Sequence, residues 1–201
     1  MKNSFEIAKK IFLENNGILR SSEAREFGIN PKTLSDMVKE GLLVKEGWGL
    51  YRLAELEPPG NSDIVYVCQR APDAVICLIS ALAFYGLTTQ IPYRVFIALP
   101  RKNKKNPRIE YPPIEVVWLG HGPYRAGIEN KDIDGFNIPI YDREKTIADC
   151  FKFRNKIGKD VAVEALRDYI RSGDRNISKL MEYARIDRVG KIMLPYIEAL
   201  V

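Results

Sequence analysis

The sequence predicts an α+β fold in two domains, a small one at residues 1–56 and a larger one at residues 61–201. The first domain is predicted from helix caps and glycine turns that follow each other closely near the N-terminus. The boundary is predicted at Glu55–Ser62, where two prolines, a glycine and an asparagine interrupt helix and strand alike. Beyond it, short β-branched segments come first and amphipathic helices follow, so we expect a mixed α/β domain that ends in a helical bundle.

The first domain opens with a predicted helix at residues 4–16, for which Ser4 is the expected cap. Its buried stripe consists of apolar residues at helical spacing: Phe5, Ala8, Ile11 and Phe12. Ile18–Arg20 follows as a candidate strand that can pair with a later hairpin.

Two further helices are predicted before residue 42. Ser21 and Ser22 can cap a helix over Glu23–Phe27, because a serine oxygen accepts an orphan amide of the first turn. The next helix starts at Asn30-Pro31, a cap residue followed by a proline at the first helical position, where no amide is needed. Gly41 ends that helix.

A β-hairpin pattern completes the first domain. Leu42–Glu46 and Leu50–Leu53 flank a Gly47-Trp48-Gly49 turn, in which the glycines can adopt positive φ. Two helices joined by a tight turn and followed by a hairpin are the order of a winged helix-turn-helix. In that fold the second helix enters the DNA major groove, so the sequence predicts a DNA-binding domain.

The outward residues of the second helix of this pair suit DNA contact. Its apolar positions face inward, which leaves a set of short hydroxyls and charged side chains outside: Lys32, Thr33, Ser35, Asp36 and Lys39. Hydroxyls and cations reach base edges and phosphates, whereas Asp36 opposes close phosphate approach. The alternative is that the helix is a protein-contact or purely structural module.

The second domain is expected to contain strands first and helices afterwards. Its predicted segments, in order, are a strand or helix entry at Asp63–Gln69, an apolar helix at Ala74–Tyr85, strands at Val95–Leu99, Ile109–Tyr111, Glu115–Leu119 and Ile138–Tyr141, a loop at Gly120–Asn130, and helices at Glu144–Phe153, Val161–Ile170, Ile177–Arg185 and Arg188–Leu200.

The positive charge is concentrated in the second domain. The net charge is +5, but residues 1–60 hold nine cations and nine anions, whereas residues 151–201 hold eleven cations and seven anions. Phosphate neutralisation supplies most non-specific DNA affinity, so the second domain is expected to help hold DNA. The possible additional phosphate contacts lie in the basic segment 101–108: Arg101, Lys102, Lys104 and Lys105. The alternative is that these charges only solvate loops and helices.

The sequence gives little sign of disulfides, a metal site, a membrane segment or a catalytic site. The three cysteines have no paired spacing, which suits a reducing cytoplasm and predicts no disulfide or metal framework. The N-terminus has too short an apolar run for a signal peptide, and Ala74–Leu87 is too short to span a bilayer. His121 is the only histidine. We therefore expect no cofactor, no metal site, no catalytic residue and no membrane partner.

The order of these segments resembles a known family, the AbiEi-type antitoxins, which are transcriptional regulators of abortive-infection and phage-defence systems. The resemblance lies in the winged helix together with ISALAFYGLT, VFIALP, YDREKTIADC and IGKDVAVEALRDYI, and it extends over nearly the whole chain. It implies a repressor that binds inverted repeats in the promoter of its own operon. It also implies a type IV antitoxin that opposes a nucleotidyltransferase toxin without a stable complex.

The same resemblance implies DNA contacts at particular residues. They fall on Lys32, Thr33, Ser35 and Lys39 of the second helix, on Lys45, Trp48 and Arg52 of the wing, and on Ser21 or Ser22 at a phosphate. Trp48 can instead pack against the base of the wing, and Arg52 can pair with Glu46 across the hairpin. Asp142, Thr146 and Asp149 are interpreted as a helix start rather than a polar site.

Two functional alternatives remain. One is a protein-interaction module that neutralises a toxin by direct contact. The remote one is a Mg²⁺-dependent nuclease, because Pro72-Asp73 followed by Glu129-Asn130-Lys131 spells the signature of such enzymes. Those nucleases place the residues on adjacent strands, whereas Asp73 is expected at a helix cap and Glu129 in a loop.

Overall fold

The computed structural model describes residues 2–45, 49–57, 61–102, 105–133 and 135–200. It contains helices together with an antiparallel sheet and a mixed sheet, so the predicted α+β class is confirmed. Contacts divide the chain into two compact units, one of residues 1–65 with 132–136 and one of residues 66–131 with 137–201. Each unit is described by itself.

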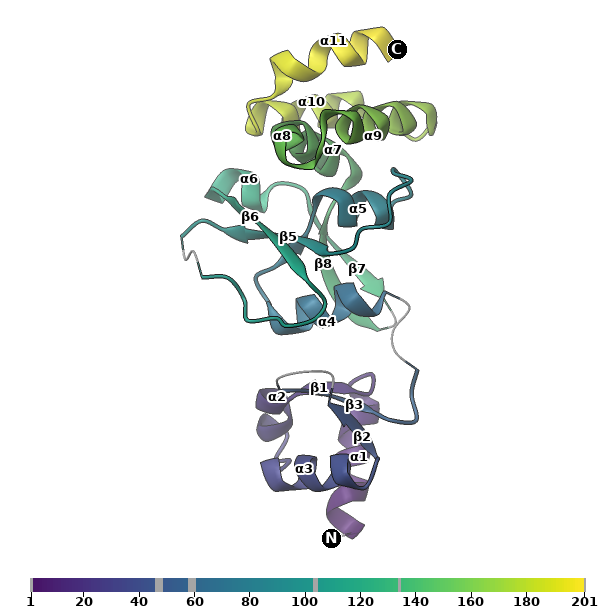
Figure 1. Ribbon diagram of the computed structural model, residues 1–201, viewed down its shortest axis with the longest axis vertical. Helices are drawn as coiled ribbons and strands as arrows, with labels where there is room; N and C mark the ends of the chain where they lie inside the picture. Colours follow the sequence, from purple (N-terminus) through teal and green to yellow (C-terminus); the bar gives the residue numbers. More distant parts are fainter. Residues whose placement is uncertain (1, 46–48, 58–60, 103–104, 134, 201) are drawn as a thin grey trace. The chain divides into compact units, whose positions relative to one another are not determined.

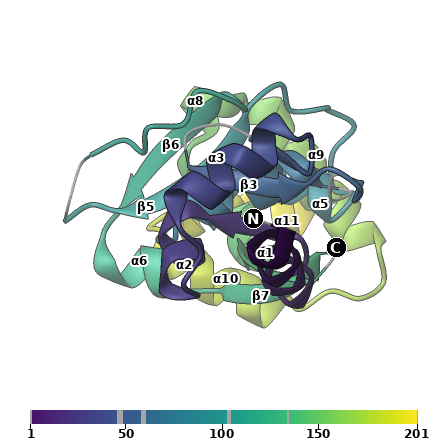
Figure 2. The same ribbon diagram turned by 90° about the horizontal axis from the view of Figure 1, so that it is seen from below.

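In the part of the first unit that the structure describes, helices surround a small sheet (Figures 1 and 2). In chain order its elements are α1 (Lys2–Glu14), β1 (Ile18–Arg20), α2 (Ser21–Glu26), α3 (Pro31–Lys39), β2 (Leu43–Lys45) and β3 (Leu50–Leu53). The antiparallel strands lie in the order β1-β3-β2, with Leu19 opposite Tyr51 and Val44 opposite Arg52. The pairing predicted for Ile18–Arg20 is thereby confirmed.

The helix caps of the first unit differ in part from the prediction. α1 begins at Lys2, so Ser4 lies inside the helix rather than at its cap. α2 begins at Ser21, and the carboxylate of Glu23 accepts the backbone amide of Arg20 at 2.7 Å. The prediction that Ser21 or Ser22 caps α2 is therefore wrong, because both serines already occupy helical positions. The predicted apolar stripe of α1 does face inward: Ala8 and Phe12 are fully buried.

The second unit is built on a five-stranded mixed sheet in the order β6-β5-β4-β8-β7. Apart from the residues of α4, β7 and β8 that fall in the first unit, its elements are α4 (Ser62–Arg70), β4 (Val75–Ile76), α5 (Leu78–Phe84), β5 (Val95–Pro100), β6 (Ile114–Leu119), α6 (His121–Arg125), β7 (Ile128–Ile133), β8 (Phe136–Tyr141), α7 (Arg143–Lys152), α8 (Arg154–Ile157), α9 (Lys159–Arg171), α10 (Ile177–Ile186) and α11 (Gly190–Leu200). β5 runs parallel to β6 and antiparallel to β4, and β4 runs parallel to β8.

Three predictions for the second unit are wrong. The apolar segment from residue 74 is not one helix: Val75–Ile76 forms the central strand β4, and α5 follows. Ile109–Tyr111 forms no strand. The segment Gly120–Asn130 was expected as a loop, but α6 begins at His121 and β7 begins at Ile128. Val75–Ile76 is a strand rather than a helix because it pairs with β5 and β8. The hydroxyl of Ser80 in α5 also accepts a hydrogen bond from the amide of Phe96 in β5, at 2.9 Å.

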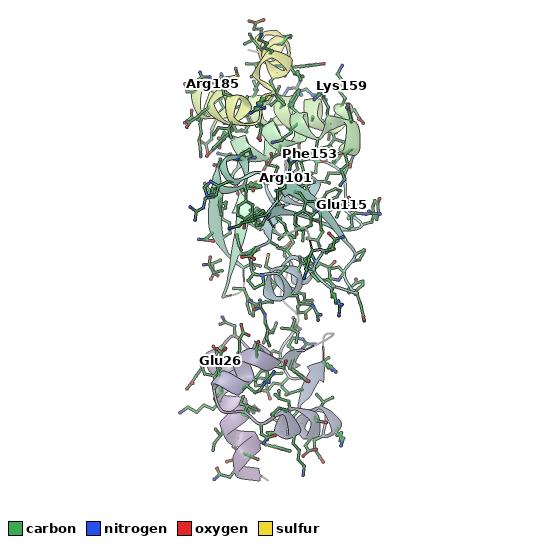
Figure 3. The ribbon with its side chains drawn as sticks, turned by 90° about the vertical axis from the view of Figure 1, so that its left-hand side faces the viewer. Glu26, Arg101, Glu115, Phe153, Lys159 and Arg185 are labelled. Carbon is green, nitrogen blue, oxygen red and sulfur yellow. The ribbon has the colours of Figure 1, made fainter. Side chains whose placement is uncertain are left out.

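The helices after residue 142 stack together on one side of the sheet (Figure 1). Their inward faces share one apolar core with α5, β5 and β6, and Tyr169, Leu166 and Phe151 are fully buried in it. Lys159 and Arg185 lie on the outer surface of these helices (Figure 3). None of the helices in the described part of the chain is long and apolar enough to cross a bilayer.

Candidate nucleic-acid interface

α3 is fixed in place by its cap and its buried face. The side chain of Asn30 accepts the backbone amide of Lys32 at 2.9 Å, and Pro31 occupies the first turn. This satisfies one of the orphan amides that every helix start leaves. Leu34 and Met37 are buried against α1 and the sheet. Because they fix which side of α3 faces inward, the residues on the opposite side of the helix face outward.

That opposite face carries the four contact residues predicted on α3. Lys32, Ser35 and Lys39 are exposed, and Thr33 is half-buried at its edge. Lys39 Nζ lies 3.8 Å from the carboxylate of Asp36, which is half-buried one helical turn away, while the lysine itself is exposed. Such pairs are weak, so an incoming phosphate can compete for the ammonium of Lys39.

The start of α2 lies beside Gly49, the residue before β3. The amide of Ser21 donates to the carbonyl of Gly49 at 2.7 Å, which joins the start of α2 to the start of β3. Ser21 is half-buried and Ser22 is exposed. The backbone of Ser21 is therefore held beside the start of β3 by this hydrogen bond.

The contact residues predicted on the wing, the hairpin of β2 and β3, have different environments. Lys45 is exposed at the end of β2, opposite Tyr51. Arg52 is buried, and its guanidinium donates to the carbonyl oxygens of Leu53, at 3.1 Å, and of Leu56. The predicted DNA contact at Arg52 does not fit this burial, because its donors are used inside the unit. Trp48 lies outside the described residues.

In the second unit, the predicted basic segment follows β5. Arg101, Lys102 and Lys105 are exposed, and Lys104 lies outside the described residues. The amide of Arg101 donates to the carbonyl of Leu119 at 2.8 Å, which holds the start of the segment beside β6. The exposed cations of this segment are available to solvent phosphate groups.

The nuclease pattern does not assemble into one site. Asp73 lies in an exposed turn before β4, and Glu129 lies on β7, so neither is where the sequence predicted it. β8 separates β4 from β7. Glu129 instead pairs with Lys131 at 2.7 Å. Within the described ranges, no group of three or more His, Cys, Asp or Glu residues could hold a metal ion.

A second group of polar residues was not predicted from the sequence. Tyr85, Lys131, Arg143 and Lys179 line one cavity in the second unit, together with carboxylates from several elements. Lys131 belonged to the nuclease pattern, and Tyr85 and Arg143 lie in the ISALAFYGLT and YDREKTIADC segments, but the sequence predicted no site that these residues share. They come from separate segments, and no local spacing relates them.

Comparison with family models gives a match in the first part of the chain. Residues 6–54 match the model described as "Transcriptional regulator, AbiEi antitoxin". The match extends from α1 to β3 and therefore includes α3 with its exposed face. It confirms the resemblance seen in the sequence, over these residues. A comparison with curated proteins gives no match.

Proposed function

We propose that this chain, whose residues 6–54 match the AbiEi antitoxin family of transcriptional regulators, is a DNA-binding autorepressor of its own operon. The observation that carries the proposal is the exposed polar face of α3, which lies inside the matched segment and is supported by a capped helix start. A regulator needs such a face free to read base edges in a groove.

The order of elements supports a winged helix-turn-helix in the first unit. α2 and α3 form the helix pair, β2 and β3 form the wing, and β1 adds the third strand. In this fold α3 lies in the major groove and the wing lies along the adjacent backbone. We propose residues 1–56 as the DNA-binding domain and residues 61–201 as an antitoxin-like α/β domain that ends in a helical bundle.

The proposed contacts follow from exposure. Lys32, Ser35 and Lys39 face the DNA, with Thr33 at the edge of the same surface. Further phosphate contacts are proposed at positions outside α3: Ser21, Ser22, Lys45 and, in the second unit, Arg101, Lys102 and Lys105. The contacts predicted at Trp48 and Lys104 stay predictions, and Arg52 is left out because its guanidinium is buried.

Under this proposal, the second unit contributes to the affinity of the protein for DNA. Residues 1–60 carry as many anions as cations, so the first domain alone offers little net attraction to DNA. The excess of cations after residue 100 supplies the missing charge. The partner is double-stranded promoter DNA with inverted repeats, and we place the protein in the cytoplasm without catalytic activity.

The antitoxin role is proposed from the family. We infer that the protein opposes a nucleotidyltransferase toxin of a type IV phage-defence operon, through repression and without a stable complex. Direct neutralisation of a toxin by a protein-interaction surface is the second candidate. Copurification with the product of the neighbouring gene at high salt and without DNA would favour that candidate over repression alone.

Retention of the upstream operon fragment in a gel tests the proposal. The full chain should retain this fragment at low ionic strength, and a Lys32→Ala/Lys39→Ala double variant should retain it much less. Lys10→Ala is the matched control, because Lys10 is an exposed lysine of α1 that forms a comparable pair with Glu14 at 3.9 Å. Failure of the wild-type protein to retain any upstream fragment at low ionic strength would overturn the proposal.

A further inference from the structure

The second unit contains a cavity of about 500 Å³. It lies where the end of α5, strand β7, the junction of β8 with α7, and the connection from α9 to α10 come together. Nine residues line it: four carboxylates, three cations, one asparagine and Tyr85. Small-molecule sites have volumes of this order, and this lining is unusually polar.

The inner carboxylates of the cavity have fixed partners. The hydroxyl of Tyr183 donates to Asp142 at 2.8 Å, and the hydroxyl of Tyr169 donates to Glu144 at 2.5 Å. Lys179 Nζ lies 3.1 Å from Asp142 and 3.4 Å from Glu144. Both carboxylates are buried. They therefore form a rigid wall that shares one ammonium, because buried charges with several partners are costly to disturb.

The outer cations of the cavity have weaker partners. Arg143 lies 2.6 Å from Asp174, whose side chain is 87% exposed. Lys131 lies 2.7 Å from Glu129, and both of these side chains are more than a third exposed. Exposed pairs of this kind contribute about 0–1 kcal/mol. Arg143 and Lys131 can therefore exchange their carboxylates for an anion of a ligand at little cost.

Tyr85 adds a hydrogen-bonding group without a partner. Its hydroxyl oxygen is buried and has no hydrogen-bond partner among the described residues. Lys131 Nζ lies 5.9 Å from the centre of its ring, so the lysine is held near the aromatic face. A buried hydroxyl without a partner is destabilising, and a ligand oxygen in the cavity would supply one.

We propose that this cavity binds a small, hydroxyl-rich phosphate monoester. The phosphate contacts Arg143 and Lys131, since a guanidinium binds phosphate oxygens in a bidentate manner. Glu129 and Asp174, once released from these cations, accept hydrogen bonds from hydroxyl groups, because ionised carboxylates act only as acceptors. A lining with both signs of charge fits a ligand that is anionic at one end and rich in hydroxyl donors at the other.

This binding site is independent of the proposed DNA contacts. All nine lining residues lie in the second unit, and none belongs to the proposed DNA-contact set. Sugar phosphates and nucleoside monophosphates share the required chemistry. Only the nucleoside monophosphates carry a base, and among the described residues that line the cavity, Tyr85 has the one aromatic ring that could contact it.

Titration calorimetry on the full chain tests the proposal with three probes: ribose 5-phosphate, adenosine monophosphate and inorganic phosphate. At least one monoester should bind saturably and more tightly than inorganic phosphate. Tighter binding of adenosine monophosphate assigns the site to nucleoside phosphates, and tighter binding of ribose 5-phosphate assigns it to sugar phosphates.

Variants place the binding in the cavity. Arg143→Gln should weaken it about tenfold or more, since a charge-assisted hydrogen bond is lost. Arg167→Gln is the matched control, because Arg167 is exposed on α9 and does not line the cavity. Tyr85→Phe removes one hydroxyl and should weaken binding several-fold. If circular dichroism shows that Arg143→Gln is unfolded, Lys131→Gln takes its place.

Three results would overturn the proposal. The first is that neither monoester binds. The second is that Arg143→Gln, or Lys131→Gln in its place, binds as tightly as wild type. The third is that inorganic phosphate binds as tightly as both monoesters, which would mean that the hydroxyl groups are not recognised.

Discussion

Lys145 Nζ lies 3.0 Å from Asp187 Oδ2, and this ion pair joins α7 to the end of α10 in the interior of the second unit. The same ammonium lies 2.5 Å from Asp149, one turn along α7. All three side chains are almost completely buried. Lys152, which is partly exposed, completes the network at 2.7 Å from Asp187. The helical layer is thus held by charge as well as by apolar packing.

Replacing Lys145 by methionine should destabilise the fold by about 3–5 kcal/mol, because two carboxylates would keep their burial and lose the ammonium. Urea denaturation at pH 8, where Asp149 is ionised, measures the change. Lys152→Met is the control, because it also removes an ammonium that pairs with Asp187. The side chain of Lys152 is 27% exposed, so the loss of stability in this variant should be smaller. Equal effects of the two variants would contradict the role assigned to Lys145.

Asp149 should make stability depend on pH. Burial raises the pKa of Asp149 to about 7, although the ammonium of Lys145 lowers it. The folded protein therefore holds a proton that the unfolded chain releases near pH 4. The contribution of this bound proton to the stability of the fold is complete below about pH 4 and is lost as the pH rises to about 7. For one proton the slope is at most about 1.4 kcal/mol per pH unit.

The difference in unfolding free energy between wild type and Asp149→Asn isolates this effect, because asparagine does not titrate. Relative to the variant, the wild type should lose stability from pH 4.5 to pH 7.5. A difference that stays constant, or that grows in favour of the wild type over this range, would exclude the assignment.

Gly127 should tolerate no side chain. Its φ is +73°, and a Cβ there would lie 2.6 Å from the Cβ of Lys145. Gly173 has nearly the same φ, +76°, but a Cβ at that position would meet nothing within 4 Å, so Gly173→Ala reports the backbone strain alone. We expect thermal unfolding to give a loss of about 1–2 kcal/mol for Gly173→Ala. Gly127→Ala should cost about 1–3 kcal/mol more, from overpacking. Equal losses would show that the close approach to Lys145 is unimportant.

Lys32→Ala and Lys39→Ala should each reduce the salt dependence of operator binding. Each lysine is proposed to neutralise one phosphate, so the slope of log K against log salt concentration should fall by roughly one per variant. Filter binding from 50 to 200 mM salt measures the slope, and Lys10→Ala should leave it unchanged. If neither α3 variant alters the slope, α3 does not contact the DNA backbone.

Local signals predicted the first unit well and the second unit in part. The cap at Asn30, the proline after it and the spacing of Leu34 and Met37 were enough to predict α3. The start of α2 was missed because the backbone of Arg20 is capped by Glu23 rather than by a serine. An apolar run at the start of the second unit was predicted as one helix, because periodicity alone does not distinguish a buried strand from a buried helix.

The sequence by itself determined the α+β class, the boundaries of α3, the outward position of Lys32, Ser35 and Lys39, and the likeness of residues 6–54 to the AbiEi regulators. Caps and helical periodicity act over a few residues, so they can be read along the chain. Tertiary structure alone decided that Lys145 meets Asp187, 42 positions away, and that Arg143, Lys131 and Tyr85 share one cavity. Burial and the pairing of distant charges depend on how separate elements pack, and no local pattern encodes them.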